Sequence, residues 1–187
     1  IRQRLEHARA QPFPLVIRGA RLIAGTDPPL ESGGHLAPVG PQVAELAARQ
    51  TARSGGLDLV VSRSFPHFGP GQHRGFALPS FCRRIAEAAR SGGGTVRVGN
   101  LSPVRDYLYV DDVTCAYCHL LAAGGSGEAY NVCSGRGRCM GDMLALLVEI
   151  SGTDIELEVD PDLFRPADVE YQVGDPGRLR ALTGWRP

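Results

Sequence analysis

The feature that most constrains this fold is the alternation of short apolar runs with amphipathic segments along the chain. Residues 57–63 (LDLVVSR) form a nearly continuous apolar run, which is typical of a strand buried on both faces of a parallel sheet. The segment before it, residues 41–54, has apolar residues at helical spacing, begins at Pro41 and is followed by Gly55. The sequence therefore predicts an α/β fold with a parallel sheet.

The same alternation continues on both sides of this pair. Strands are expected within residues 15–25, 95–100, 128–135 and 154–161, and helices within residues 1–10, 79–94, 109–125 and 139–152. Ser80 is a candidate cap for the helix within 79–94. Asp111 and Asp112 fall in the first turn of the next helix, where negative charge interacts favourably with the helix dipole.

Charge and composition exclude several classes of protein. The chain has 187 residues, with 20 basic and 20 acidic side chains and a formal net charge of zero. This balance gives no reason to expect a nucleic acid or an anionic membrane as a partner. No apolar run approaches the roughly 20 residues of a membrane helix, and the first residues contain no secretory signal. We therefore expect a cytoplasmic protein.

The five cysteines are odd in number and scattered, which favours reduced thiols over a disulfide framework. Cys115 and Cys118 have C-x-x-C spacing, but no second pair lies at a spacing typical of zinc sites. We interpret them as buried helix cysteines and predict no metal site. All 20 basic residues are arginine, so no lysine of this chain can take part in catalysis.

Five spaced segments carry a resemblance to a known family. They are SRSFPHFGPGQ (62–72), VGNLSPVRDYLYVDDVTCAY (98–117), YNVCSG (130–135), RPADVEYQVGD (165–175) and GWRP (184–187). In this order and spacing they resemble the extended short-chain dehydrogenase/reductase family, in the nucleotide-sugar branch around GDP-mannose 4,6-dehydratase. The chain contains no G-x-G-x-x-G loop between a strand and a helix. The resemblance implies that relatives carry this loop in a preceding half, and that this chain starts after it.

The resemblance also implies a division of the chain into two interleaved parts. Residues 1–63 and 106–124 would form the remainder of a Rossmann-like nucleotide-binding domain. Residues 64–105 and 125–187 would form a small lobe that binds a nucleotide sugar. The expected fold is therefore the C-terminal part of a Rossmann-like parallel sheet with an interleaved substrate-binding lobe.

The substrate site implied by the resemblance is largely retained. Asn100 and Leu101 match positions near the nucleotide base. The loop with His67 and Gln72 matches a turn beside the bound sugar nucleotide. We expect His67 and Gln72 to form hydrogen bonds within that loop. Pro66 departs from the family, which has an asparagine there that contacts the sugar nucleotide. A GDP-sugar is the favoured ligand.

Two arginines are implied as ligands of the diphosphate. Arg105 and Arg165 would each supply a planar guanidinium, which suits bidentate contacts with phosphate oxygens. The alternative for Arg105 is a surface salt bridge with Asp106 or Asp111.

The catalytic positions are substituted. The family uses a Ser or Thr hydroxyl and a Tyr-x-x-x-Lys pair, with NAD or NADP accepting hydride. The resemblance places Ala20 at the Ser/Thr position, Gln42 at the tyrosine and Leu46 at the lysine. None of these side chains can act as the base or lower its pKa, so no catalytic residue is predicted, and cofactor binding by this chain is left open.

Three functional hypotheses remain open. The first is a GDP-mannose 4,6-dehydratase-like protein that retains a nucleotide-sugar site but is catalytically impaired. The second is a non-catalytic binding or scaffold protein that pairs with an active paralogue. The third is an active enzyme completed by a missing N-terminal segment.

A homodimer or higher oligomer is expected through the helix within 41–54. In the family this helix packs in a dimer, and Val43, Leu46, Ala47 and Gln50 form a stripe at three- and four-residue spacing. The alternative is that this stripe packs against the protein's own sheet, and both arrangements can hold.

Overall fold

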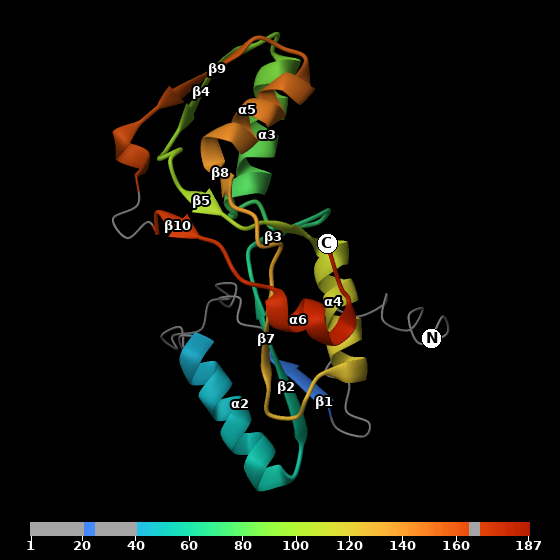
Figure 1. The fold of residues 1–187 in the computed structure, drawn as a ribbon. Coiled ribbons are helices and arrows are strands. Elements are labelled where there is room, and N and C mark those ends of the chain that lie inside the picture. Colours follow the sequence, from blue (N-terminus) through green and yellow to red (C-terminus); the bar gives the residue numbers. More distant parts are fainter. Residues whose placement is uncertain (1–20, 25–40, 165–168) are drawn as a thin grey trace.

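The computed structural model describes residues 21–24, 41–164 and 169–187, and it describes side chains for residues 45–164 and 169–187. Figure 1 shows two parts joined by a narrow region of short strands. One part contains β1, β2, β7, α2, α4 and α6, and the other contains α3, α5, β4 and β9. We call the first part the sheet domain, the second the lobe and the strands between them the waist.

The sheet domain is built on a parallel sheet with the strand order β1-β2-β7. Its strands are β1 (Arg21–Ala24), β2 (Asp58–Ser64) and β7 (Ala129–Val132). The helices around it are α2 (Pro41–Gly55), α4 (Val110–Ala123) and α6 (Gly177–Thr183). Successive side chains of β2 point to opposite faces, so Leu59 and Val61 pack with Ala52 of α2, whereas Val60 packs with Leu120 of α4. The sheet is therefore covered on both faces, as parallel sheets require.

The lobe has its own hydrophobic core. It consists of α3 (Ala77–Arg90), β4 (Gly94–Val98), α5 (Met140–Ser151), β9 (Ile155–Val159) and the short 3-10 helix η2 (Pro161–Leu163). β4 and β9 pair in parallel, and the two helices contribute Leu78, Ile85 and Leu144 to one buried cluster with Val98. This cluster shares no residue with the clusters of the sheet domain.

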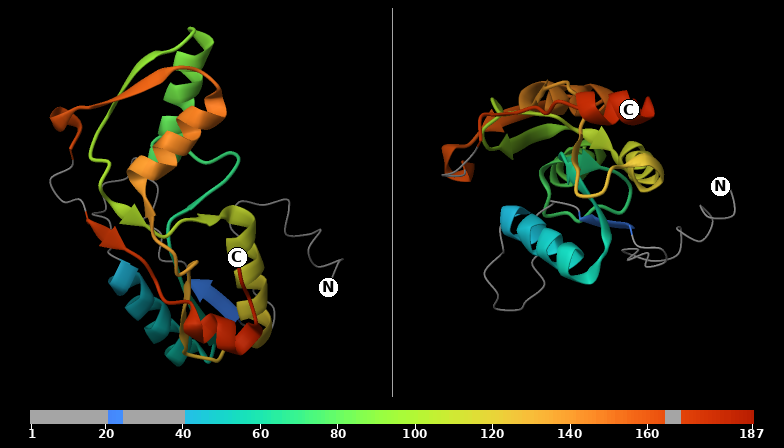
Figure 2. Two further views of the ribbon diagram at one scale, coloured as in Figure 1. Left: turned by 45° about the horizontal axis from the view of Figure 1, so that its top comes forward. Right: turned by 60° about the horizontal axis from the view of Figure 1, so that its bottom comes forward.

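The waist consists of two small sheets. In one, β3 (His67–Phe68) pairs with β6 (Leu108–Tyr109). In the other, β5 (Val104–Arg105) lies between β10 (Tyr171–Gln172) and β8 (Arg138–Cys139). The left view in Figure 2 shows the chain passing through this region more than once between the two parts. Segments that are far apart in the sequence therefore meet here.

The α/β fold with parallel strand pairing is confirmed. The predicted apolar run at 57–63 is β2, and the expected helices within 41–54, 109–125 and 139–152 are α2, α4 and α5. Both aspartates predicted in the first helical turn, Asp111 and Asp112, occupy it. The helix expected within 1–10 lies outside the described residues.

Two sequence predictions are wrong. Ser80 does not cap α3, because the helix begins three residues earlier and its N-cap is Phe76. Apolar spacing alone did not locate that first turn, which contains Pro79. Cys115 and Cys118 are exposed on α4 and not buried. The buried face of this helix is formed by Val113, Ala116 and Leu120, and the cysteines lie between these positions.

The sequence-based division of the chain assigned residues 125–187 to the lobe. In the structure β7 pairs with β2, and Leu179 of α6 belongs to the same buried cluster as Val132 of β7. We propose that residues 129–132 and 177–183 are grouped with the sheet domain. Among the described residues, no helix is long and apolar enough to cross a membrane.

Candidate functional site

The carboxyl ends of two parallel strands position the candidate site. β2 ends at Ser64 and continues into Pro66 and His67, and β7 ends at Val132 and continues into Ser134. Ligands of open α/β sheets bind beyond the carboxyl ends of the strands. The waist lies at this edge of the sheet domain (Figure 1).

A buried carboxylate organises this edge. Asp106 is 0% exposed, and its Oδ1 accepts hydrogen bonds from the Ser134 backbone N (2.8 Å) and the Ser134 hydroxyl (2.6 Å). Its Oδ2 accepts from the backbone N of Gly135 (2.8 Å) and of Gly174 (3.4 Å). One side chain from the waist therefore fixes the loop after β7 and the segment before α6.

Two arginines lie on the face of the waist strands that is opposite to the Asp106 side chain. Arg105 of β5 is directly opposite Arg138 of β8 in an antiparallel pair, and residues paired in this way have side chains on the same face. Because neighbouring residues of a strand alternate, Asp106 points to the other face from Arg105. The carboxylate of Asp106 already accepts four hydrogen bonds and is buried. It therefore does not form the surface salt bridge with Arg105 that was the predicted alternative.

A cavity of about 260 Å³ lies beside this face. It is lined by Tyr107, Ser134, Arg136, Arg138, Arg180, Arg186 and Pro187. Arg180 reaches the loop after β7 from α6, where its Nη2 donates to the Ser134 carbonyl at 2.6 Å. Its Nε is buried and has no hydrogen-bond partner among the described residues. The cavity is thus lined by four arginines from two parts of the chain, the loop and strand after β7 and the C-terminal segment.

Tyr107 forms an aromatic wall of this cavity. Its ring meets Phe68 edge to face, with 6.2 Å between the ring centroids. Burial raises the pKa of the Tyr107 hydroxyl, and the nearby charge of Arg105 opposes that rise. The hydroxyl therefore stays protonated at neutral pH and can donate a hydrogen bond. Cys133 lies behind the loop, where burial and the Asp106 charge raise its pKa to about 12, so it remains a neutral thiol.

The predicted residues of the loop after β2 are engaged with one another. The Nδ1 of His67 donates to the Phe65 carbonyl at 3.1 Å, and the Nε2 of Gln72 donates to the His67 carbonyl at 2.9 Å. The Oε1 of Gln72 is buried without a hydrogen-bond partner in the described part of the chain. Pro66 is half-buried, and its carbonyl accepts from the backbone N of Leu108 at 3.0 Å. The loop is thereby fixed to the waist.

The predicted base-binding segment is also held by local contacts. The Oδ1 of Asn100 accepts from the backbone N and the hydroxyl of Ser102, at 3.0 and 2.9 Å. The carbonyl of Leu101 accepts from the backbone N of Gly141 at 2.9 Å, which joins this segment to the start of α5. Arg165, the second predicted diphosphate ligand, lies outside the described residues. The structure brings Arg138 beside Arg105, a neighbour that sequence reasoning missed.

Comparisons with known proteins agree with this architecture. Residues 41–187 match the family model described as GDP-mannose 4,6 dehydratase. The chain belongs to this family. The GDP-6-deoxy-D-mannose reductase of Pseudomonas aeruginosa is 35% identical over 150 residues, covering 78% of this chain and 49% of that protein. The GDP-6-deoxy-D-talose 4-dehydrogenase of Aggregatibacter actinomycetemcomitans is 29% identical over 126 residues, 67% of this chain and 42% of that protein.

Solved structures give the same result. The structure of RMD from Pseudomonas aeruginosa complexed with NADPH superposes with a TM-score of 0.75 at 29% identity, over 90% of this chain and 62% of that one. A putative epimerase from Burkholderia cenocepacia superposes with a TM-score of 0.72 at 29% identity, over 91% of this chain and 59% of that one. The chain spans about half the length of the curated relatives it matches.

The family resemblance places substitutions at three catalytic positions, and the structure describes the side chain of only one of them. Ala20 lies outside the described residues, and of Gln42 only the backbone, in the first turn of α2, is described. The side chain of Leu46 is 66% exposed. The α2 residue that reaches β2 is the preceding one, Glu45, whose carboxylate accepts from Arg63 at 3.0 Å.

Glu45 and Arg63 were missed by sequence reasoning, although a partial signal exists. Glu45 also accepts two hydrogen bonds from Arg49, at 2.9 and 2.7 Å, and their four-residue spacing is visible in the sequence. The Arg63 contact lowers the pKa of Glu45, with Arg49 contributing and burial opposing. This ion pair fixes the register of α2 against the carboxyl end of β2.

The described residues do not fit the pyrophosphate of a dinucleotide. Such a site needs a glycine-rich turn that leads directly from a parallel strand into a helix. β2 leads into β3, and β7 leads through the loop at 133–137 into β8, so neither strand enters a helix directly.

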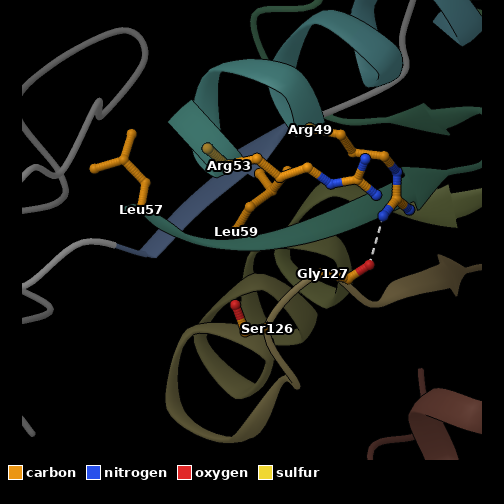
Figure 3. Close-up of a pocket in the computed structure, with 7 residues that line it drawn as sticks. Arg49, Arg53, Leu57, Leu59, Ser126 and Gly127 are labelled. Atoms are coloured by element: carbon orange, nitrogen blue, oxygen red, sulfur yellow. Dashed lines mark hydrogen bonds between the residues drawn. The ribbon is translucent and has the colours of Figure 1, made fainter. Parts of the chain in front are cut away.

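A second, smaller cavity lies at the other end of the sheet. It measures about 160 Å³, and Figure 3 shows Arg49, Arg53, Leu57 and Gly127 around it, with Arg49 donating to the Gly127 carbonyl at 2.5 Å. Leu57 precedes β2 and Gly127 precedes β7, so this cavity lies at the amino ends of the strands. The arginine-lined cavity, at the carboxyl ends, is the better candidate for a ligand site.

Proposed function

We propose that this member of the GDP-mannose 4,6-dehydratase family binds a nucleotide sugar, with a GDP-sugar favoured, and is impaired in the redox step of its relatives. The observation that carries the binding proposal is the pairing of Arg105 with Arg138 across β5 and β8, next to an arginine-lined cavity. Guanidinium groups bind phosphate oxygens through charge-assisted and often bidentate hydrogen bonds. Curated relatives are named for GDP-6-deoxy sugars, which supports the choice of base.

Six further positions complete the proposed site. We propose that Asn100 and Leu101 lie near the base, and that the loop with Pro66, His67 and Gln72 lies near the sugar. The buried, unpartnered Oε1 of Gln72 supports this, because it is an acceptor that a ligand hydroxyl could satisfy. Arg165 is proposed as a further diphosphate ligand on the resemblance alone.

The proposed impairment rests on chemistry that the chain lacks. Proton abstraction in this family needs a tyrosinate whose pKa is lowered by a lysine ammonium, and the sequence contains no lysine. Leu46 carries no charge, and its side chain points to solvent. The alternative, a non-catalytic partner of an active paralogue, is favoured by the same observation. An active enzyme completed by a further N-terminal segment would need to supply the base and the cofactor site from outside this chain.

The test combines binding with turnover. Isothermal titration of the chain with GDP-mannose, UDP-glucose and dTDP-glucose should give saturable binding, tightest for GDP-mannose. Arg105→Gln should weaken that binding about tenfold or more, the loss expected for one charge-assisted phosphate contact. Incubation with GDP-mannose and NADP+ should give no 4-keto product by mass spectrometry.

Arg83→Gln is the matched control, because Arg83 is exposed on α3 and pairs with Glu87 away from the waist. It should leave binding unchanged. Absence of heat with all three nucleotide sugars would remove the binding proposal. Turnover by the isolated chain would instead contradict the impairment and favour the third hypothesis.

We further propose that α2 is the contact surface of a homodimer. Leu46, Ala47 and Gln50, three members of the predicted stripe, are exposed, whereas α2 packs on the sheet through Ala48 and Ala52. The alternative that this stripe packs against the protein's own sheet is therefore wrong for these three residues. A face with a 66% exposed leucine is suited to burial against a second copy.

A further inference from the structure

We propose that the arginine-lined cavity is a binding site for a phosphate-bearing ligand, formed by Arg136 and Arg138 of the loop and strand after β7 together with Arg180 and Arg186 of the C-terminal segment. The sequence predicts a solvated loop at residues 136–139, with a contact to the nucleotide as the alternative, and it assigns no role to Arg180 or Arg186. The inference does not depend on nucleotide-sugar binding, because it concerns the phosphate group alone.

The first argument is that three arginines of this cavity have no carboxylate partner among the described residues. Several arginines elsewhere are paired with carboxylates, as Arg49 and Arg63 are with Glu45, and Arg97 with Asp160 at 2.6 Å. Arg136, Arg138 and Arg186 make no salt bridge to any carboxylate in the described part of the chain. Guanidinium groups that share a cavity repel one another unless an anion lies between them.

The second argument concerns the acidic groups nearby. Asp106 accepts four hydrogen bonds on the other side of the loop and is fully buried there. Asp175 accepts from the backbone N of Gly177 at 2.8 Å, at the start of α6. Both carboxylates accept hydrogen bonds from nearby segments, and neither forms a salt bridge with Arg136 or Arg138 in the described part of the chain. The fold thus uses its local acids to position the loop that carries Arg136 and Arg138.

The third argument is that the cavity has hydrogen-bond donors available for an anion. The Nε of Arg180 is buried without a partner among the described residues, although its Nη2 is fixed by the Ser134 carbonyl. A buried donor without a partner is costly, and an oxyanion in the cavity would satisfy it. The protonated hydroxyl of Tyr107 adds a neutral donor on the adjacent wall. A cavity of about 260 Å³ has room for a diphosphate group.

Inorganic pyrophosphate is the appropriate probe, since it carries neither base nor sugar. Titration calorimetry at constant ionic strength should show saturable binding of one pyrophosphate per chain. The double variant Arg136→Gln/Arg138→Gln should weaken it about tenfold or more. Both side chains are exposed and make no hydrogen bond within the described residues, so the variant should fold, which circular dichroism checks.

The matched control is Arg83→Gln/Arg90→Gln, which removes the same charge from exposed positions on α3. Equal weakening in both double variants would show only general electrostatic attraction and would overturn the proposal. Failure of the unchanged protein to bind pyrophosphate would also overturn it.

Competition identifies the source of the phosphate. If GDP-mannose displaces pyrophosphate, the cavity holds the diphosphate of the nucleotide sugar. If both bind together, the cavity takes a separate phosphate-bearing ligand. Loss of GDP-mannose binding with pyrophosphate binding retained would refute the nucleotide-sugar proposal and leave this one standing.

Discussion

At the residue scale, Asp106 joins two segments of the chain near the candidate site. It is fully buried, and its two oxygens accept from Ser134, Gly135 and Gly174. These donors belong to two segments that are distant in the sequence. A carboxylate is suited to this position because it only accepts hydrogen bonds and can accept several at each oxygen.

Replacing Asp106 by asparagine should therefore destabilise the protein. The amide nitrogen would face donors at one of the two oxygen positions, leaving at least one buried N–H unsatisfied at a cost of about 1–3 kcal/mol. Urea unfolding followed by circular dichroism measures this loss. Asp154→Asn is the control, because this side chain is exposed and makes no hydrogen bond within the described residues, and it should change stability by less than about 0.5 kcal/mol. Equal stabilities of the two variants would contradict the role given to Asp106.

At the element scale, α2 is held to the sheet by two kinds of contact. Ala52 packs on Leu59 and Val61 along the middle of β2. Near the start of the helix, Glu45 is 13% exposed and pairs with Arg63 at the carboxyl end of the strand. The apolar contact gives most of the attraction, and the ion pair selects one position of the helix along the strand.

Glu45→Gln should lower the free energy of unfolding by about 1 kcal/mol at pH 7. The pKa of Glu45 is lowered in the folded state, chiefly by Arg63, so its stabilising effect is present above the unfolded value near 4.3 and is lost as the pH falls through the lower folded value. The stability difference between the two proteins should therefore shrink steadily below about pH 4. Urea unfolding at a series of pH values measures it.

Glu87→Gln tests whether any glutamate–arginine pair gives this result. The Glu87 side chain is 53% exposed and pairs with Arg83 one turn away on α3, so its effect at pH 7 should stay below about 0.5 kcal/mol. A pH-independent difference for Glu45→Gln would show that shape and not charge holds α2 in place.

At the scale of the whole molecule, the sheet domain and the lobe have separate cores and meet through the waist. Helix α2 lies in the sheet domain (Figure 1), and Leu46, Ala47 and Gln50 are exposed on it. None of these residues lines the arginine-lined cavity. Oligomerisation and ligand binding should then be separable by mutation.

Size-exclusion chromatography with light scattering should give twice the mass of one chain for the unchanged protein, and one chain's mass for Leu46→Glu. A charge at this position would be buried without a partner in the dimer, which costs more than the contact gains. Leu146→Glu, at a 54% exposed position on α5, should remain dimeric. A monomeric unchanged protein, or a dimer that tolerates both glutamates, would exclude α2 as the contact.

Local pattern predicted the elements well. The apolar run of β2, the helical spacing of α4 and α5 and the acidic first turn of α4 are properties of adjacent residues, and the structure has all of them. The prediction that Cys115 and Cys118 are buried was wrong, because only one face of a helix packs against the protein. The spacing of the apolar residues did not show which face that was. The predicted start of α3 was wrong, because a proline such as Pro79 can lie within the first turn of a helix as well as at its first residue.

The sequence by itself determined the α/β class, the family, and the absence of any lysine that could serve as the catalytic one, since these depend on residue identity and on spacing within short segments. Only the tertiary structure decided that Arg105 lies opposite Arg138, that Arg180 reaches the Ser134 loop, and that Asp106 holds that loop from behind. The physical reason is that these contacts join residues 28 to 46 positions apart. Such contacts form only when the two packed parts bring the waist strands together, and no local periodicity records that arrangement.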